Sequence, residues 1–170
     1  TIAAGCGQLL NASVGMEVKQ EDTVVQNLSM QYEITDIDKD IDVQNATEIQ
    51  MNNLEDNILN INEGGSYILT GKNDNCNIVI NAFDDEKIHL FLKNAELSAE
   101  SGPVIYAEKA GKVIITVVED TENMISDSPE YATETEACIF SNCDLTINGS
   151  GKLFAYGYYH DAIRSKDRLK

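Results

Sequence analysis

Four aspartates at alternating positions are the densest set of hard metal ligands in the chain: Asp36, Asp38, Asp40 and Asp42. In a strand, side chains two residues apart lie on one face, so these carboxylates would stand in a row at about 6.6 Å spacing. Carboxylate oxygens select Ca²⁺ over softer metals. An EF-hand loop is excluded because Ile41 stands where that loop requires glycine. The row therefore predicts either a calcium site or a plain solvated acidic face.

A second group of residues, near the end of the chain, is aromatic and comprises Phe154, Tyr156, Tyr158, Tyr159 and His160. The first three alternate, which would place their rings on one face of a strand. Sugar rings present C–H faces that pack on aromatic rings, and tyrosine adds a hydroxyl group for hydrogen bonding. We predict that Tyr156, Tyr158, Tyr159 and His160 bind carbohydrate. The alternative is that the rings fill the core or form a stacked ladder.

Two more aspartates, Asp161 and Asp167, flank the next predicted strand. Their carboxylates could bind calcium on the surface of that strand. They could instead pair with the basic side chains nearby, which are Arg164, Lys166 and Arg168. We predict metal ligands at both aspartates, with ion pairing as the alternative.

Catalytic residues are not predicted. Elimination from a uronan requires a base beside a carboxylate and a cation that stabilises the developing charge. The candidates late in the chain are Lys152, Arg164 and Lys166, but a basic residue on a strand is more often a plain surface charge. Neither histidine lies in a nucleophile motif, and His89, in an alternating apolar run, is expected to face solvent.

Composition limits the classes of partner. The chain has 170 residues, with 29 acidic and 12 basic side chains and a formal net charge of -17. Binding to nucleic acid phosphates needs clustered Lys and Arg, so a nucleic-acid partner is not expected. No apolar run approaches the roughly 20 residues that span a bilayer. The length suits one domain with a tail.

The N-terminal segment predicts attachment to a membrane by lipid. Residues Ala3-Ala4-Gly5-Cys6 resemble a lipobox, in which small residues precede a cysteine that becomes lipidated. The alternative is an ordinary leader residue. Residues 1–30 are polar and lack periodicity, so we interpret them as a tether, with the folded domain in residues 31–170. The predicted location is the bacterial cell surface, or the medium after secretion.

The other three cysteines are Cys76, Cys138 and Cys143. They form no Cys-x-x-Cys pair and no histidine follows them at zinc spacing, so a structural zinc site is not expected. We predict buried free thiols that act as small apolar residues.

The elements that must position these side chains are strands. From Ile58 onward, short runs rich in β-branched residues alternate with Gly, Asn and Asp, which predicts an all-β chain. Residues 137–145 recur as residues 161–169 at an offset of 24, with Ile139 matching Ile163, Ser141 matching Ser165 and Leu145 matching Leu169. Such a repeat favours a coil of parallel strands, in which rungs stack about 4.8 Å apart, over a sandwich or a barrel.

The repeats also resemble a known family. The family is one of bacterial secreted carbohydrate-binding domains, and the similarity lies in residues 137–141, 144–151 and 160–167. The entry segment of that family resembles residues 36–40 and 46–49 of this chain. Ala162 replaces the usual glycine. The resemblance implies a right-handed parallel β-helix similar to calcium-dependent polysaccharide lyases, with bound calcium and further rungs beyond Lys170.

The function expected from the resemblance is a cell-surface module that binds cellulose or pectin with the help of Ca²⁺. The alternatives are a calcium-dependent polysaccharide lyase and a protein-binding adhesin or stalk.

Overall fold

The computed structural model describes residues 45–130 and 135–170. Cys6 and the aspartates of the predicted calcium row, Asp36, Asp38, Asp40 and Asp42, lie outside the described residues. The described part contains twelve strands and one short 3₁₀ helix, η2 (Met51–Asn53). For these residues the prediction of an all-β fold is confirmed. No helix in this part is long and apolar enough to cross a bilayer.

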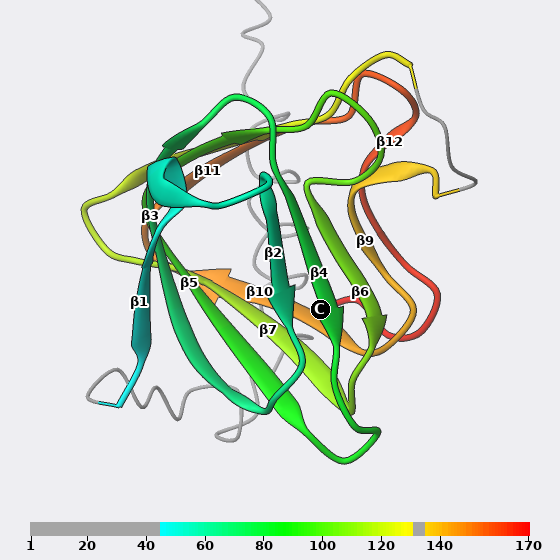
Figure 1. Ribbon diagram of the computed structural model, residues 1–170. Helices are drawn as coiled ribbons and strands as arrows, with labels where there is room; N and C mark the ends of the chain where they lie inside the picture. The colour runs from blue at the N-terminus through cyan, green and yellow to red at the C-terminus, as the bar shows by residue number, and fades with distance from the viewer. Residues whose placement is uncertain (1–44, 131–134) are drawn as a thin grey trace, which may run out of the picture. The chain divides into compact units, whose positions relative to one another are not determined.

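The strands form two sheets (Figure 1). The first sheet runs in the order β1 (Thr47–Gln50), β3 (Gly65–Asn73), β5 (Lys87–Ser98), β7 (Lys112–Val117) and β10 (Leu145–Gly149). Two further strands branch from it: β8 (Glu122–Ser126) pairs with the end of β5, and β11 (Lys152–Tyr156) pairs with β8. The second sheet runs in the order β12 (Asp161–Ser165), β9 (Ala137–Ser141), β6 (Ile105–Lys109), β4 (Asn77–Asn81) and β2 (Ile58–Ile61).

Every strand pair in the described residues is parallel. The chain passes from one sheet to the other and back, so that strands far apart in sequence become neighbours. Two all-parallel sheets connected in this way are consistent with a parallel β-helix.

The apolar core takes side chains from both sheets. Ile88, Leu90 and Leu92 of β5 belong to it, as do Ile105 and Ala107 of β6. They occupy every second position because successive side chains of a strand point to opposite faces of the sheet. Many residues in register are alike: Leu92 lies between Leu69 and Val117 of the adjacent strands, and Val113 lies beside Leu145. Like side chains therefore stack from strand to strand.

The predicted repeat is confirmed as direct strand pairing. Ile139 and Ser141 of β9 are in register with Ile163 and Ser165 of β12, and Leu145 forms a parallel bridge with Leu169. The hydroxyl groups of Ser141 and Ser165 both donate to the carbonyl of Cys143, at 2.7 and 3.0 Å. The repeated serines thus hold the turn after β9 against the next strand.

The three cysteines in the described residues are buried and free, as predicted: Cys76, Cys138 and Cys143. Desolvation disfavours the thiolate, and it raises the pKa of Cys76 to about 11 and that of Cys138 to about 12. Because the thiolate is the nucleophile, these residues are inert at neutral pH and serve in packing.

The expectation that His89 faces solvent is wrong. His89 and Phe91 lie on the face of β5 that points away from the core, but both side chains are buried. Their rings stack with centroids 4.2 Å apart, and the His89 Nε2 atom lies 2.8 Å from the Thr116 hydroxyl oxygen. The alternating sequence pattern correctly placed His89 on the face of the strand away from the core, but it did not predict that the side chain is buried there.

The two isoleucines of the repeat make a stability test. Ile139 is fully packed in the core while Ile163 is only partly buried against it. We expect Ile139→Ala to lower the free energy of unfolding by about 2–5 kcal/mol, since it removes buried methylene groups and leaves a cavity. Ile163→Ala should lower it clearly less. Urea denaturation measures both, and equal losses would contradict the difference in packing.

Candidate functional site

An exposed aromatic strip lies on β11 and the loop after it. Phe154, Tyr156 and Tyr158 are 46%, 42% and 62% exposed, whereas Leu153 and Ala155 between and beside them are less exposed. The rings of Tyr156 and Tyr158 stack at 6.1 Å between centroids and 10° between planes. The rings therefore stand on an outer face and do not fill the core, while the stacking of Tyr156 and Tyr158 agrees with the alternative of a stacked ladder.

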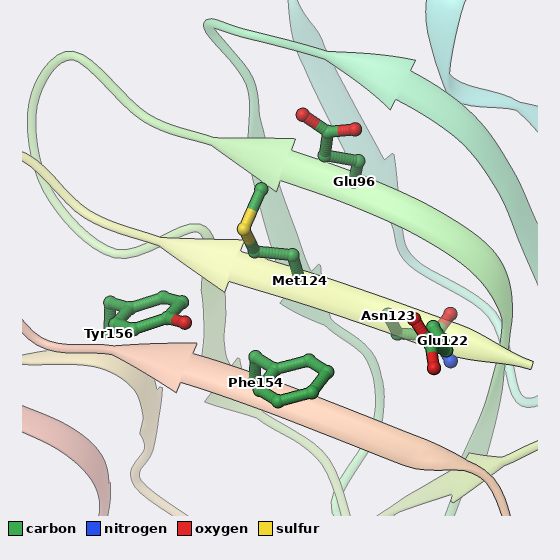
Figure 2. Close-up of a pocket in the computed structure, with 6 residues that line it drawn as sticks. All are labelled: Glu96, Glu122, Asn123, Met124, Phe154 and Tyr156. Atoms are coloured by element: carbon green, nitrogen blue, oxygen red, sulfur yellow. The ribbon is translucent and has the colours of Figure 1, made fainter.

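Two rings of the strip, Phe154 and Tyr156, line a groove of about 330 Å³ across three parallel strands. Figure 2 shows its lining residues on neighbouring strands: Glu96 on β5, Glu122, Asn123 and Met124 on β8, and Phe154 and Tyr156 on β11. Phe154 is in register with Met124, which is in register with Glu96. The parallel pairing therefore brings together side chains that are 28 and 30 residues apart in sequence.

The chain after Tyr156 is held in place by Asp127, which is buried. The backbone N–H of Asp127 donates to the Tyr156 carbonyl at 3.2 Å, and the backbone N–H of Tyr158 donates to the Asp127 carboxylate. Gly157, between the two tyrosines, passes so close to the chain ahead that a Cβ atom there would lie 2.3 Å from the Asp161 carbonyl carbon. These contacts fix how the two rings are presented.

Carboxylates flank the apolar part of the groove. Glu122 forms an ion pair with Lys152, and Glu96 pairs with Lys72 at 2.7 Å. Hydrogen bonds from Lys72 to Glu96 and then to Asp74 raise the pKa of Lys72. The groove thus offers aromatic faces together with carboxylate oxygens, which accept hydrogen bonds from hydroxyl groups.

Asn123, beside the groove, has a structural role. Its side chain is buried, accepts a hydrogen bond from the Ala95 N–H at 2.8 Å, and donates to the Thr121 hydroxyl at 2.9 Å. It joins β8 to the bend in β5, where Asn94 adopts a positive φ of 55°.

Of the four residues predicted to bind carbohydrate, Tyr156 lines the groove and the other three, Tyr158 among them, do not. Tyr159 and His160 are exposed in the loop between β11 and β12 and are not among the groove's lining residues. The His160 Nδ1 atom lies 3.3 Å from an Asp161 oxygen. Sequence analysis missed Glu96, Glu122 and Met124, because only strand register places them beside the rings.

The predicted metal ligands that the structure describes lie at opposite ends of β12. Asp161 is at its start, where its carboxylate faces His160 and Arg164; Asp167 lies just after its end. Among residues 45–130 and 135–170, no group of three or more His, Cys, Asp or Glu side chains is arranged to hold a metal ion. Calcium binding by Asp161 and Asp167 stays a prediction.

Of the three basic residues considered as lyase candidates, Arg164 and Lys166 line one hollow, whereas Lys152 lies apart from them. Lys152 lies on β11 in the first sheet, where it pairs with Glu122. Arg164 lies on β12 in the second sheet and pairs with Glu136, while Lys166 lies over the Phe140 ring. They do not form a common reaction centre.

Replacing Asp127 should loosen the pair of tyrosines. Asp127→Ala leaves the Tyr158 N–H without its acceptor, so we expect unfolding free energy to fall by about 1–3 kcal/mol, together with a changed near-ultraviolet circular dichroism signal from tyrosine. Asp127→Asn keeps an acceptor oxygen and should have a smaller effect. The exposed Asp85→Ala serves as control, and an equal change in that variant would contradict the role of Asp127.

Comparison with known proteins shows which family the chain belongs to. A family model described as "Carbohydrate-binding domain-containing protein" matches residues 55–170. A curated protein of that description from Acetivibrio thermocellus is 25% identical over 137 residues, which covers 77% of this chain and 48% of the relative. The chain therefore spans about half the length of the curated relative that it matches.

A solved structure has a similar fold. It is the gadolinium derivative of the polysaccharide lyase-like protein from C. thermocellum, which superposes with a TM-score of 0.68 at 21% sequence identity. The match covers 73% of this chain and 56% of that chain. At this level of identity the likeness concerns the fold alone.

Proposed function

The chain belongs to the family of carbohydrate-binding domain-containing proteins, and on that premise we propose that the groove along β8 and β11 binds a plant-type polysaccharide. The observation that carries the proposal is the exposed aromatic strip of Phe154, Tyr156 and Tyr158. Exposed rings in a row form an apolar patch, and such patches mark ligand-binding grooves and other interaction sites. The fitting ligand is a polymer with apolar ring faces and many hydroxyl groups.

The chemistry of the groove suits a polysaccharide such as cellulose. The ring faces of Tyr156 and Phe154 pack against the C–H faces of pyranose rings. The carboxylates of Glu96 and Glu122, each paired with a lysine, accept hydrogen bonds from sugar hydroxyl groups. Since the groove crosses the strands and is open, it accommodates a segment of a long chain.

We also propose that the strands form successive turns of one right-handed coil, in which the two sheets are faces and each turn contributes strands to both. Strands β3 and β5 are parallel neighbours, and the chain between them passes through β4 in the other sheet. Connections of this kind between parallel strands are right-handed in nearly all proteins. A right-handed coil supports the proposed function, because it stacks outward side chains into continuous rows.

The proposal extends to location. A module that holds polysaccharide works outside the cell, and the lipobox-like residues ending at Cys6 would attach it to the cell surface. Secretion without a lipid is the other arrangement compatible with this function.

Removing one ring tests the glycan site. Tyr156→Ala should weaken binding to cellohexaose by about tenfold, since the loss of one aromatic contact of about 1.4 kcal/mol corresponds to a factor of ten. The matched control is Phe83→Ala, because Phe83 is 71% exposed but lies in the turn between β4 and β5. Isothermal titration calorimetry measures both variants. Unchanged binding in Tyr156→Ala, or no binding by the unaltered protein, would refute the site.

Calcium is proposed to assist the module, with Asp36, Asp38, Asp40, Asp42, Asp161 and Asp167 as the expected ligands. A ligand that binds only the folded state raises the melting temperature as its concentration increases. We therefore expect millimolar CaCl₂, but not the same concentration of MgCl₂, to raise the melting temperature by several degrees. Asp38→Asn combined with Asp40→Asn should abolish the increase. An identical melting temperature in CaCl₂ and in chelator would rule out structural calcium.

A further inference from the structure

A row of four side chains crosses the first sheet at the groove and continues beyond it. Lys72 on β3 is in register with Glu96 on β5, and Glu96 is in register with Met124 on β8. Met124 is in turn in register with Phe154 on β11. Figure 2 shows the last three members of this outer row on neighbouring strands. Lys72 is not among the residues that line the groove, so the outer row extends one strand further than the groove does.

The side chains of the outer row point away from the core. Ala95 and Leu97, on either side of Glu96, belong to the core, so Glu96 lies on the opposite face of the strand. The side chain of Lys72 and the residue Phe154, at the two ends of the row, are 55% and 46% exposed. The outer row is therefore accessible to a ligand from end to end.

The chemistry changes along the outer row. Met124 and Phe154 present apolar surface, whereas Glu96 and Lys72 form an ion pair with 2.7 Å between the Lys72 Nζ and Glu96 Oε1 atoms. The Lys72 Nζ atom also lies 3.1 Å from Asp74 Oδ1. Since an ammonium group has three donors, one remains for a ligand hydroxyl group, and the Glu96 carboxylate accepts from another. One end of the row thus offers packing and the other offers hydrogen bonds.

Two directions are open to a polysaccharide at this site. The chain could cross the strands along the outer row, or it could follow β11 over Tyr156 and Tyr158. Neighbouring strands are about 4.8 Å apart, which is close to the length of one pyranose ring in an extended chain, whereas side chains on one face of a strand are about 6.6 Å apart. The groove is lined by residues from three strands, and Tyr158 is not one of them. The rings of Tyr156 and Tyr158 also stack on each other, which covers part of their faces.

We propose that the bound polysaccharide lies across the strands along the outer row, with about one sugar per strand, and that Lys72 is a further ligand-binding residue at the end of its footprint. This direction rests on the proposed function, because it concerns the same groove and the same ligand. Sugars near Phe154 and Met124 are held by packing, and those near Glu96 and Lys72 by hydrogen bonds.

Replacing Lys72 tests where the footprint ends. Lys72→Met removes the donors and keeps an unbranched stem, so we expect it to weaken binding to cellohexaose by about threefold to tenfold, the effect of one hydrogen bond. Cellotriose, which would reach from Phe154 to Glu96, should bind this variant and the unaltered protein equally. Lys87→Met makes the same change at an exposed lysine at the start of β5 and should alter neither affinity. Isothermal titration calorimetry measures all of them.

The variant Tyr158→Ala distinguishes the two directions. It should leave cellohexaose binding unchanged if the chain follows the outer row, and weaken it if the chain follows β11. A loss in Tyr158→Ala without a loss in Lys72→Met, or an equal loss in Lys72→Met and Lys87→Met, would overturn the proposed direction. The glycan site itself would still stand in those cases, provided that Tyr156→Ala weakens binding. If Tyr156→Ala has no effect, or the unaltered protein does not bind cellohexaose, both proposals fail.

An NMR titration of the isotope-labelled protein with cellohexaose gives a readout that needs no substitution. We expect the amide signals of residues 71–73 and 95–97 to shift together with those of residues 153–155. If Lys72→Met and Tyr158→Ala both weaken binding, shifts at residues 71–73 uphold the direction across the strands. Shifts confined to residues 152–160 would overturn it.

Discussion

Parallel backbone pairing between strands one turn apart is the interaction on which the rest of this structure depends. It fixes the register at which residues such as Ile139 and Ile163 become neighbours, and that register then applies to both faces of the strand. Inward positions align into an apolar core, and outward positions align into rows. The core and the binding surfaces are therefore set by the same hydrogen bonds.

The sequence allowed the fold to be predicted where its signals are local or repeated. The 24-residue offset identified three pairs that lie in register, and the alternation of Phe154, Tyr156 and Tyr158 placed their rings on one face but left open whether that face is exposed. Both predictions succeeded because a period of two or a direct copy can be recognised without knowing how the turns are connected.

The remaining residues of the groove could not be predicted in that way. Glu96, Met124 and Phe154 are aligned across β5, β8 and β11, and the turns between these strands have unequal lengths, so register could not be counted along the chain. The Asp127 carboxylate accepts a hydrogen bond from the backbone N–H of Tyr158, and no sequence pattern indicates a contact of this kind. His89 was assigned to the correct face, but packing against Phe91 and Thr116 determines its burial.

The shared carbonyl of Cys143, to which Ser141 and Ser165 both donate, has an evolutionary consequence. Ser165 supplies the donor that docks its copy of the repeat on the preceding copy, and Ser141 closes the turn within that preceding copy. Duplication of one such unit would lengthen the coil without redesigning its neighbours. Gene duplication alone could then change the number of sugars that the protein binds, while the existing contacts between turns are kept.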